Sequence, residues 1–177
     1  MPALSSHAYQ PALPAFCNLA EAVERMASSG IAGRGAIFTR PEVVEFILDL
    51  VGYTTDKPLH RERLLEPSFG GGDFLLAAVR RLIGSYEASK QSDPVQDLAD
   101  AIRAVELHKA TFSETFWRLN DLLVQLGLSK DQAGALCQTW LIRDDFLLTD
   151  IDQGFTCFVG NPPYVRQELI PQRTSID

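Results

Sequence analysis

The residues best suited to chemistry form a short motif near the C-terminal end of the sequence, Asn161-Pro162-Pro163-Tyr164. The motif follows an apolar run, residues 155–159, that is typical of a buried strand. The two prolines exclude both a helix and further strand pairing, and a residue before proline is kept extended. An amide side chain, backbone carbonyls and an aromatic ring are therefore held in nearly fixed positions. This arrangement is suited to gripping a planar group that carries an NH2.

The same motif also has a purely structural interpretation. Asn-Pro-Pro is ordinary turn chemistry, and a tyrosine beside a turn can simply pack on the surface. The motif alone leaves both interpretations open, so the residues elsewhere in the chain have to separate them.

Acidic side chains follow the other predicted strands at the equivalent position. Short apolar segments at Leu64–Glu66, Ile102–Glu106 and Trp140–Arg143 are predicted strands, and helical patterns separate them. Strands that alternate with helices form a parallel sheet, and such sheets bind ligands at the carboxyl ends of their strands. We therefore expect one edge of the sheet to carry four polar residues: Glu66, Glu106, Asp145 and Asn161.

A glycine-rich turn, Pro67–Gly72, joins the first predicted strand to a helix predicted from Asp73 to Tyr86. Its three consecutive glycines allow a sharp bend and a close approach of a ligand to the backbone. No Lys-Ser or Lys-Thr follows the glycines, so the turn is not a phosphate-binding loop. The carboxylates of Glu66 and Asp73 flank it, which suits a cationic or hydroxyl-bearing ligand and disfavours phosphate.

Glu106 ends the second predicted strand and has two interpretations. An acid at this place in nucleotide-binding α/β folds bonds the two ribose hydroxyls, usually about twenty residues after the glycines. The gap here is longer, which an additional short helix accommodates. A solvated carboxylate at a strand end is the alternative.

The helix upstream of the glycine turn is predicted from Arg40 to Val51. Thr39 is a good N-cap, Glu42 completes a capping box, and Phe38 can pack onto Val43. The helix presents one apolar face, which consists of Val43, Val44, Ile47, Leu50 and Val51.

Further elements follow from the same patterns. Residues 1–14 carry three prolines and are predicted to be a loose arm, and residues 15–28 a short helix. Residues 111–126 form the clearest amphipathic helix, with Gly127 as its stop. A last helix is predicted over residues 130–138, capped by Ser129 with Gln132.

The composition of the 177 residues is that of an ordinary globular domain, with 46% hydrophobic and 22% charged residues. Three cysteines and three histidines lack metal-ligand spacing, so we expect no metal, reduced thiols and a cytoplasmic protein. The sequence shows no signal peptide pattern and no apolar run long enough to span a bilayer, so we expect a soluble protein. The net charge of -7 has the wrong sign for a protein that binds nucleic acid unaided. Basic clusters occur at residues 57–63 and at Arg80-Arg81, but such runs are usually solvated.

Taken in order, these motifs resemble those of S-adenosylmethionine-dependent DNA adenine-N6 methyltransferases of restriction-modification systems. Residues 35–44 look like the upstream cofactor motif, residues 65–75 like the glycine loop, and Asn161–Tyr164 like the catalytic loop. Phe69 stands where the family usually has a smaller residue, and Gly71 where many members have Ser or Thr. The resemblance implies a Rossmann-like parallel sheet of the class I methyltransferase type, incomplete here, with an N-terminal helical extension.

The same resemblance assigns roles to individual residues. Asn161, Pro162, Pro163 and Tyr164 would be catalytic, with two acceptors gripping the exocyclic amine and Tyr164 stacking on a flipped-out adenine. Glu106 would bond the ribose hydroxyls, and Asp145 would accept from the adenine of the cofactor. The implied contacts with S-adenosylmethionine are made by Phe38, Thr39, Pro41, Glu66, Pro67, Phe69, Gly70, Glu106, Leu107, Asp145 and Phe146.

We expect two parts in the chain, an arm and short helix over residues 1–32 and a partial catalytic domain over residues 33–177. The chain stops soon after Tyr164, so we expect a fragment that binds cofactor weakly and methylates DNA poorly alone. Double-stranded DNA would be held mainly by target-recognition regions outside this chain. Two alternatives stay open, a methyltransferase acting on a protein glutamine amide or an RNA base, and a non-catalytic cofactor-binding remnant.

Overall fold

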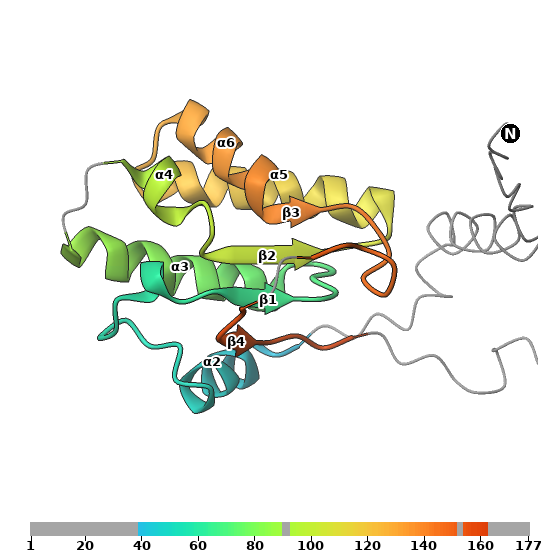
Figure 1. The fold of residues 1–177 in the computed structure, drawn as a ribbon, viewed down its shortest axis with the longest axis horizontal. Helices are drawn as coiled ribbons and strands as arrows, with labels where there is room; N and C mark the ends of the chain where they lie inside the picture. The colour runs from blue at the N-terminus through green and yellow to red at the C-terminus, as the bar shows by residue number, and fades with distance from the viewer. Residues whose placement is uncertain (1–38, 90–92, 152–153, 163–177) are drawn as a thin grey trace, which may run out of the picture.

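A computed structural model describes residues 39–89, 93–151 and 154–162. The predicted N-terminal arm and helix, together with Phe38, Pro163 and Tyr164, lie outside these residues. Within the described part, the strands form one four-stranded sheet in the order β3-β2-β1-β4 (Figure 1). Every pairing in it is parallel. The predicted α/β fold with a Rossmann-like parallel sheet is confirmed, and the predicted N-terminal helical extension lies outside the described residues.

The strands are short and lie where the sequence places them: β1 spans Leu64–Glu66, β2 Ile102–Val105, β3 Leu141–Ile142 and β4 Cys157–Phe158. The prediction for β3 began one residue early. Trp140 is the last residue of the preceding helix, where its buried indole donates to the Leu98 carbonyl over 2.8 Å. That bond anchors the end of the helix before the chain becomes extended.

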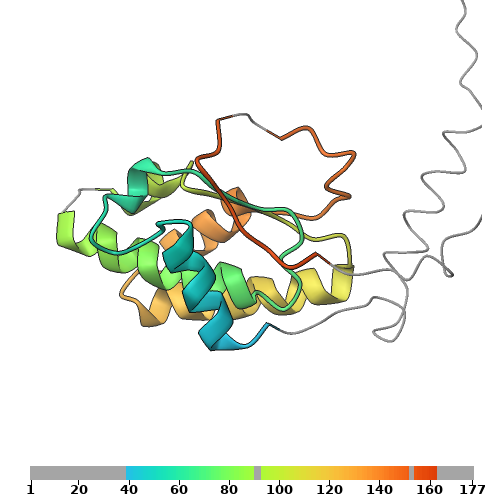
Figure 2. The same ribbon diagram turned by 90° about the horizontal axis from the view of Figure 1, so that it is seen from below.

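The helices connect the strands and give the sheet its cover: α2 Pro41–Leu50, a 3-10 turn η2 Leu59–Arg61, α3 Asp73–Ser89, α4 Pro94–Leu98, α5 Lys109–Gln125 and α6 Lys130–Trp140. In Figure 2, α2, α3 and α5 lie on one side of the sheet, and the segment between β3 and β4 lies on the other. Alternate strand residues face these two sides. Cys157 is therefore buried in the core, whereas its neighbour Phe158 is 63% exposed.

The predicted cap of α2 is wrong. The N-cap is Arg40, without a side-chain bond, and the helix begins at Pro41. The residue before a proline is kept out of the helical region, so Arg40 takes the cap position and Thr39 lies one residue too early. The predicted buried face is also only partly right, since Val44 and Leu48 are buried while Val43, Leu50 and Val51 are exposed.

The remaining helices agree better with the sequence. The capping box of α6 is present, with Ser129 and Gln132 bonding each other's backbone N–H. The apolar side of α5 packs against α6 and α3 and includes a buried polar residue, Thr115. Within the described residues, none of the helices is long and apolar enough to cross a membrane.

Candidate active site

The glycine-rich turn between β1 and α3 is held in place by its neighbours. The Phe69 N–H donates to the Val105 carbonyl over 3.0 Å, and the Gly70 N–H donates to the Glu106 carboxylate over 3.0 Å. The Gly70 carbonyl accepts from the Thr115 hydroxyl over 2.8 Å. The turn is thus tied to the end of β2 on one side and to α5 on the other.

Three residues of this turn differ in the space around them. Gly72 has a φ of +82°, and a Cβ there would lie 2.8 Å from the Thr115 Cγ2, so only glycine fits. The bulky side chain of Phe69 is buried and packs on Phe112 with ring centroids 5.8 Å apart. Phe69 can therefore contact a ligand only through its backbone. A Cβ at Gly70, in contrast, would meet nothing within 4 Å, which leaves room for a ligand.

Glu66, the last residue of β1, is an acid placed where a cation would stabilise it. Its side chain is 1% exposed, and its Oε2 has no hydrogen-bond partner among the described residues. Burial, and then the nearby carboxylates of Asp73 and Glu106, raise the pKa of the Glu66 carboxyl well above its ordinary value. A positively charged or hydrogen-bond-donating ligand would compensate both the charge and the missing partner.

Glu106, the residue after β2, is buried and already organised. One carboxylate oxygen accepts from the Gly70 N–H and the other from the His108 N–H over 2.7 Å. Each carboxylate oxygen can accept more than one hydrogen bond, so hydroxyl donors could still bind. Leu107 follows it and is half-buried.

Asn161 follows β4 and reaches the segment before α2. Its Nδ2 lies 3.2 Å from the Thr39 hydroxyl oxygen, and the Thr39 N–H donates to the Asp73 carboxylate over 2.8 Å. Gly160 runs close to the end of β1, since a Cβ there would lie 3.5 Å from the Pro67 ring. These contacts bring together the segment after β4, the segment before α2 and the start of α3. Pro162, the next residue after Asn161, is exposed.

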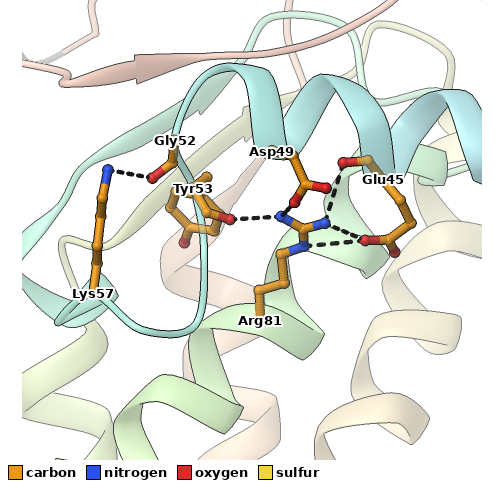
Figure 3. Close-up of polar contacts among 6 residues, drawn as sticks. All are labelled: Glu45, Asp49, Gly52, Tyr53, Lys57 and Arg81. Atoms are coloured by element: carbon orange, nitrogen blue, oxygen red, sulfur yellow. Dashed lines mark hydrogen bonds and ion pairs between the residues drawn. The ribbon is translucent and has the colours of Figure 1, made fainter.

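The position of α2 depends on Arg81 of α3, a residue of the basic pair that was expected to be solvated. Its guanidinium donates to the Asp49 carboxylate over 2.7 Å, to the Tyr53 carbonyl over 2.9 Å, and to the Glu45 carboxylate (Figure 3). The side chain is only 13% exposed, so this part of the Arg80-Arg81 pair is not solvated. Lys57 closes the following turn by donating to the Gly52 carbonyl.

Asp145 and Phe146 lie apart from this cluster, in the segment after β3. The Asp145 carboxylate accepts from the Leu147 N–H over 2.9 Å, and the Asp145 carbonyl accepts from Thr149. Phe146 lines a groove with Leu65 and Phe158. Within the described residues, no hydrogen bond joins Asp145 to the other predicted site residues.

Of the remaining sequence predictions, Pro41 lies at the first position of α2, beside Thr39. No group of His, Cys, Asp and Glu within the described residues could hold a metal ion. Asp73, which the sequence places beside the glycine turn, also bonds the Thr39 N–H, and Thr115 is a contributor that was not predicted. A polar residue inside the apolar stripe of α5 was the available signal for Thr115.

The sequence of this chain is similar to those of three characterised proteins. The chain is 54% identical to the type II methyltransferase M.PaeR7I of Pseudomonas aeruginosa over 94% of its own length. It is 51% identical to the type II methyltransferase M.XhoI of Xanthomonas vasicola over 78% of its length, and 44% identical to M.BstVI of Geobacillus stearothermophilus over 77%. Over the matched region, the chain is thus similar to three type II methyltransferases.

The matched region is a limited part of those proteins. The chain spans 29%, 26% and 25% of the lengths of these three methyltransferases. No family model matches the sequence, and no solved structure does. The similarity therefore concerns this segment of those proteins alone.

Proposed function

We propose that this chain is the cofactor-binding and catalytic part of a DNA methyltransferase of a restriction-modification system, which methylates the exocyclic N6 of adenine. The observation that carries the proposal is the grouping of Glu66, Glu106 and Asn161 at the carboxyl ends of β1, β2 and β4. These strands are adjacent and parallel, so their ends share one edge of the sheet. The relatives' names support methyl transfer.

The residues present fit S-adenosylmethionine as the cofactor. The buried, unpartnered Glu66 carboxyl suits a cationic ligand, and Glu106 can accept from ribose hydroxyls. The open space at Gly70 lets a ligand lie against the backbone of the glycine turn. Asp145 would accept from the adenine of the cofactor, and Phe146 would pack on that ring. When bound, the cofactor supplies an electrophilic methyl group attached to a sulfonium.

The work of the chain is to prepare the amine that receives this methyl group. The lone pair of an exocyclic amine is delocalised into its ring, so the amine is a poor nucleophile. The Asn161 side-chain oxygen and the Pro162 carbonyl would accept its two hydrogens, localise the lone pair and stabilise the positive charge that develops. Tyr164 would stack on the base, and Pro163 would keep the loop stiff.

Double-stranded DNA is the proposed partner, with most contacts made by regions outside this chain. An adenine inside a duplex cannot reach the loop, so the base has to be flipped out of the stack. The net charge of -7 means that this chain contributes little to the grip on phosphates.

The test is methyl transfer by the full-length protein from radiolabelled S-adenosylmethionine to duplex DNA, RNA or a glutamine-containing peptide, with the modified base identified by mass spectrometry. N6-methyladenine in DNA is expected. Label in RNA or peptide only would replace the DNA proposal.

Two variants separate binding from chemistry. Asn161→Ala should lower turnover by roughly a hundredfold or more while it leaves cofactor affinity unchanged. Asp145→Ala should weaken cofactor binding in calorimetry. Turnover retained in Asn161→Ala would remove its catalytic role, and cofactor binding by the wild type without methyl transfer would favour a non-catalytic remnant.

A further inference from the structure

Helix α2 carries more apolar side chains than the core covers. Val44 and Leu48 are buried in the core. Val43, Phe46 and Leu50, in contrast, are 44%, 63% and 73% exposed. These three residues occupy positions i, i+3 and i+7 of the helix, so their side chains lie together and form the outer face of α2. An apolar face of this kind normally packs on another element, and this one is exposed in the part of the chain that the structure describes.

A rotation of α2 cannot bury its outer face. Leu48, on the opposite side of the helix, is fully buried. Glu45 and Asp49, on a third side, both accept from Arg81 of α3 (Figure 3). A rotation that buried Phe46 would break these ion pairs and expose Leu48. Cover for the outer face therefore has to come from a segment other than the described core.

The segment that precedes α2 in the sequence has a matching pattern. Residues 15–28 lie outside the described residues, and their sequence predicts a short helix. Leu19, Val23 and Met26 stand at i, i+4 and i+7 and share one side of that predicted helix, whereas its charged residues fall on the other side. An isolated helix this short is marginal in water, so it needs an apolar surface on which to pack.

The two apolar faces have the same length. Leu19 and Met26 are seven positions apart, and so are Val43 and Leu50. At about 1.5 Å per residue, each face extends about 10 Å along its helix axis. Packed side by side, the two helices can therefore cover each other's apolar residues from end to end.

The connection between the two segments permits this packing. Residues 29–38 are ten in number and include three glycines. Such a length spans at most about 33–36 Å, which is enough to reverse the chain and return along α2 as an antiparallel helical hairpin. A tether of this length also gives the segment an effective concentration of about millimolar at α2, which favours it over a partner from another molecule.

We propose that the outer face of α2 is the docking site of residues 15–28 of the same chain, which pack on it as an antiparallel helix with Val23 beside Phe46. The inference goes beyond the proposed function and does not depend on it. It accounts for the apolar positions of α2 that the sequence predicted to be buried and that are exposed. Docking also stabilises the start of α2, where the Thr39 N–H bonds Asp73 next to the glycine turn.

Disulfide trapping in the full-length protein tests the docked geometry. Val23→Cys with Phe46→Cys should form an intramolecular disulfide on mild oxidation, identified by mass spectrometry of the linked peptides. The matched control is Val23→Cys with Phe158→Cys. Phe158 is also 63% exposed, but its neighbour Cys157 faces the core, so Phe158 lies on the side of the sheet opposite α2 (Figure 2). The control pair should react at least about tenfold more slowly.

A double-mutant cycle tests whether the two segments stabilise each other. Truncation of an exposed side chain changes stability little, whereas truncation of one that is covered by another element lowers it. Phe46→Ala and Val23→Ala should each lower the thermal midpoint of the full-length protein by about 3 °C or more. The double variant should lose clearly less than the sum of the two single losses. Phe158→Ala combined with Val23→Ala should instead be additive.

Every other outcome overturns the inference. A disulfide between two molecules would assign the outer face of α2 to a second copy of the protein. Equal rates for the two cysteine pairs would show that the segment does not dock. A loss in Phe46→Ala that is additive with Val23→Ala would assign the face to another part of the protein. A shift below about 1 °C for Phe46→Ala would show that the face stays in solvent.

Discussion

The two ends of the proposed cofactor site are held very differently. At the ends of β1 and β2, Glu66 and Glu106 are buried, and the glycine turn between them is bonded to β2 and α5. After β3, in contrast, Leu147 is 86% exposed, and the hydrogen bonds of Asp145 within the described part of the chain stay inside its own segment. The helices α2, α3 and α5 cover one side of the sheet (Figure 2), and α5 supplies Thr115, which bonds the glycine turn.

The two ends should differ in the conformational entropy that they lose when a ligand binds. A site whose donors and acceptors are already fixed loses little entropy when a ligand arrives, whereas a loosely held segment has to be ordered at that moment. The β1–β2 end should therefore supply affinity at little conformational cost. Substitutions there should affect both stability and binding, while substitutions after β3 should affect binding alone.

The largest effect is expected for Glu106→Ala. The change removes both acceptors that hold the Gly70 and His108 N–H groups. Hydrogen bonds to a charged group each contribute roughly 1.5–3 kcal/mol, so the free energy of unfolding should fall by about 3 kcal/mol. Urea unfolding measures this, and calorimetry should show cofactor binding abolished. Glu106→Gln, which keeps the shape and one acceptor, should lose less stability than Glu106→Ala. An unchanged free energy of unfolding for Glu106→Ala would contradict the contrast between the two ends of the site.

A smaller effect is expected for Gly72→Ala, with Gly70→Ala as its matched control. Both glycines have positive φ, +82° and +50°, but only at Gly72 would a Cβ collide with Thr115. We expect a loss of about 2–3 kcal/mol for Gly72→Ala and about 1 kcal/mol for Gly70→Ala. Gly70→Ala should instead weaken cofactor binding, because its methyl group enters the open space. Equal losses in urea unfolding would show that sterics at Thr115 are unimportant.

The better-fixed end is also the better predicted one. β1 and the body of β2 follow from short-range patterns, namely buried apolar runs. Such patterns depend on residues close in sequence. They place Glu66 and Glu106 at strand ends without any knowledge of the tertiary structure.

The relations that long-range packing creates were not predictable in this way. The Thr39–Asn161 bond joins residues 122 positions apart, and Thr39 was assigned to a cap that Pro41 displaces. Arg81 has a partner set that comes from α2 and the turn after it, so its charge looked solvated in the sequence. Local propensity contains no information on which distant acceptor a side chain will meet.

A stabilising change is expected for Glu66→Gln. Because the pKa of Glu66 is raised in the fold, the folded state binds more protons than the unfolded state above the ordinary pKa of glutamate. The free energy of unfolding therefore falls as pH rises through this window, by up to about 1.4 kcal/mol per pH unit, and the glutamine variant should lack this slope. Urea unfolding at several pH values measures it. The variant should be more stable near neutral pH yet bind S-adenosylmethionine more weakly, and a variant that binds as well as the wild type would remove Glu66 from the site.

The smallest effect on stability is expected for Asp145→Ala, which tests the loosely held end. The carboxylate accepts one bond from the exposed Leu147 N–H, so its loss should change the free energy of unfolding by at most about 0.5 kcal/mol. Cofactor affinity should nevertheless fall about tenfold, because a hydrogen bond to a charged group is lost in the complex. Asp144→Ala is the control, since that neighbouring acid accepts from the Asp145 N–H, its one side-chain bond among the described residues, and should leave affinity unchanged. If Asp145→Ala instead destabilised the protein as much as Glu106→Ala, the segment after β3 would be part of the fixed framework, and the contrast between the two ends would not hold.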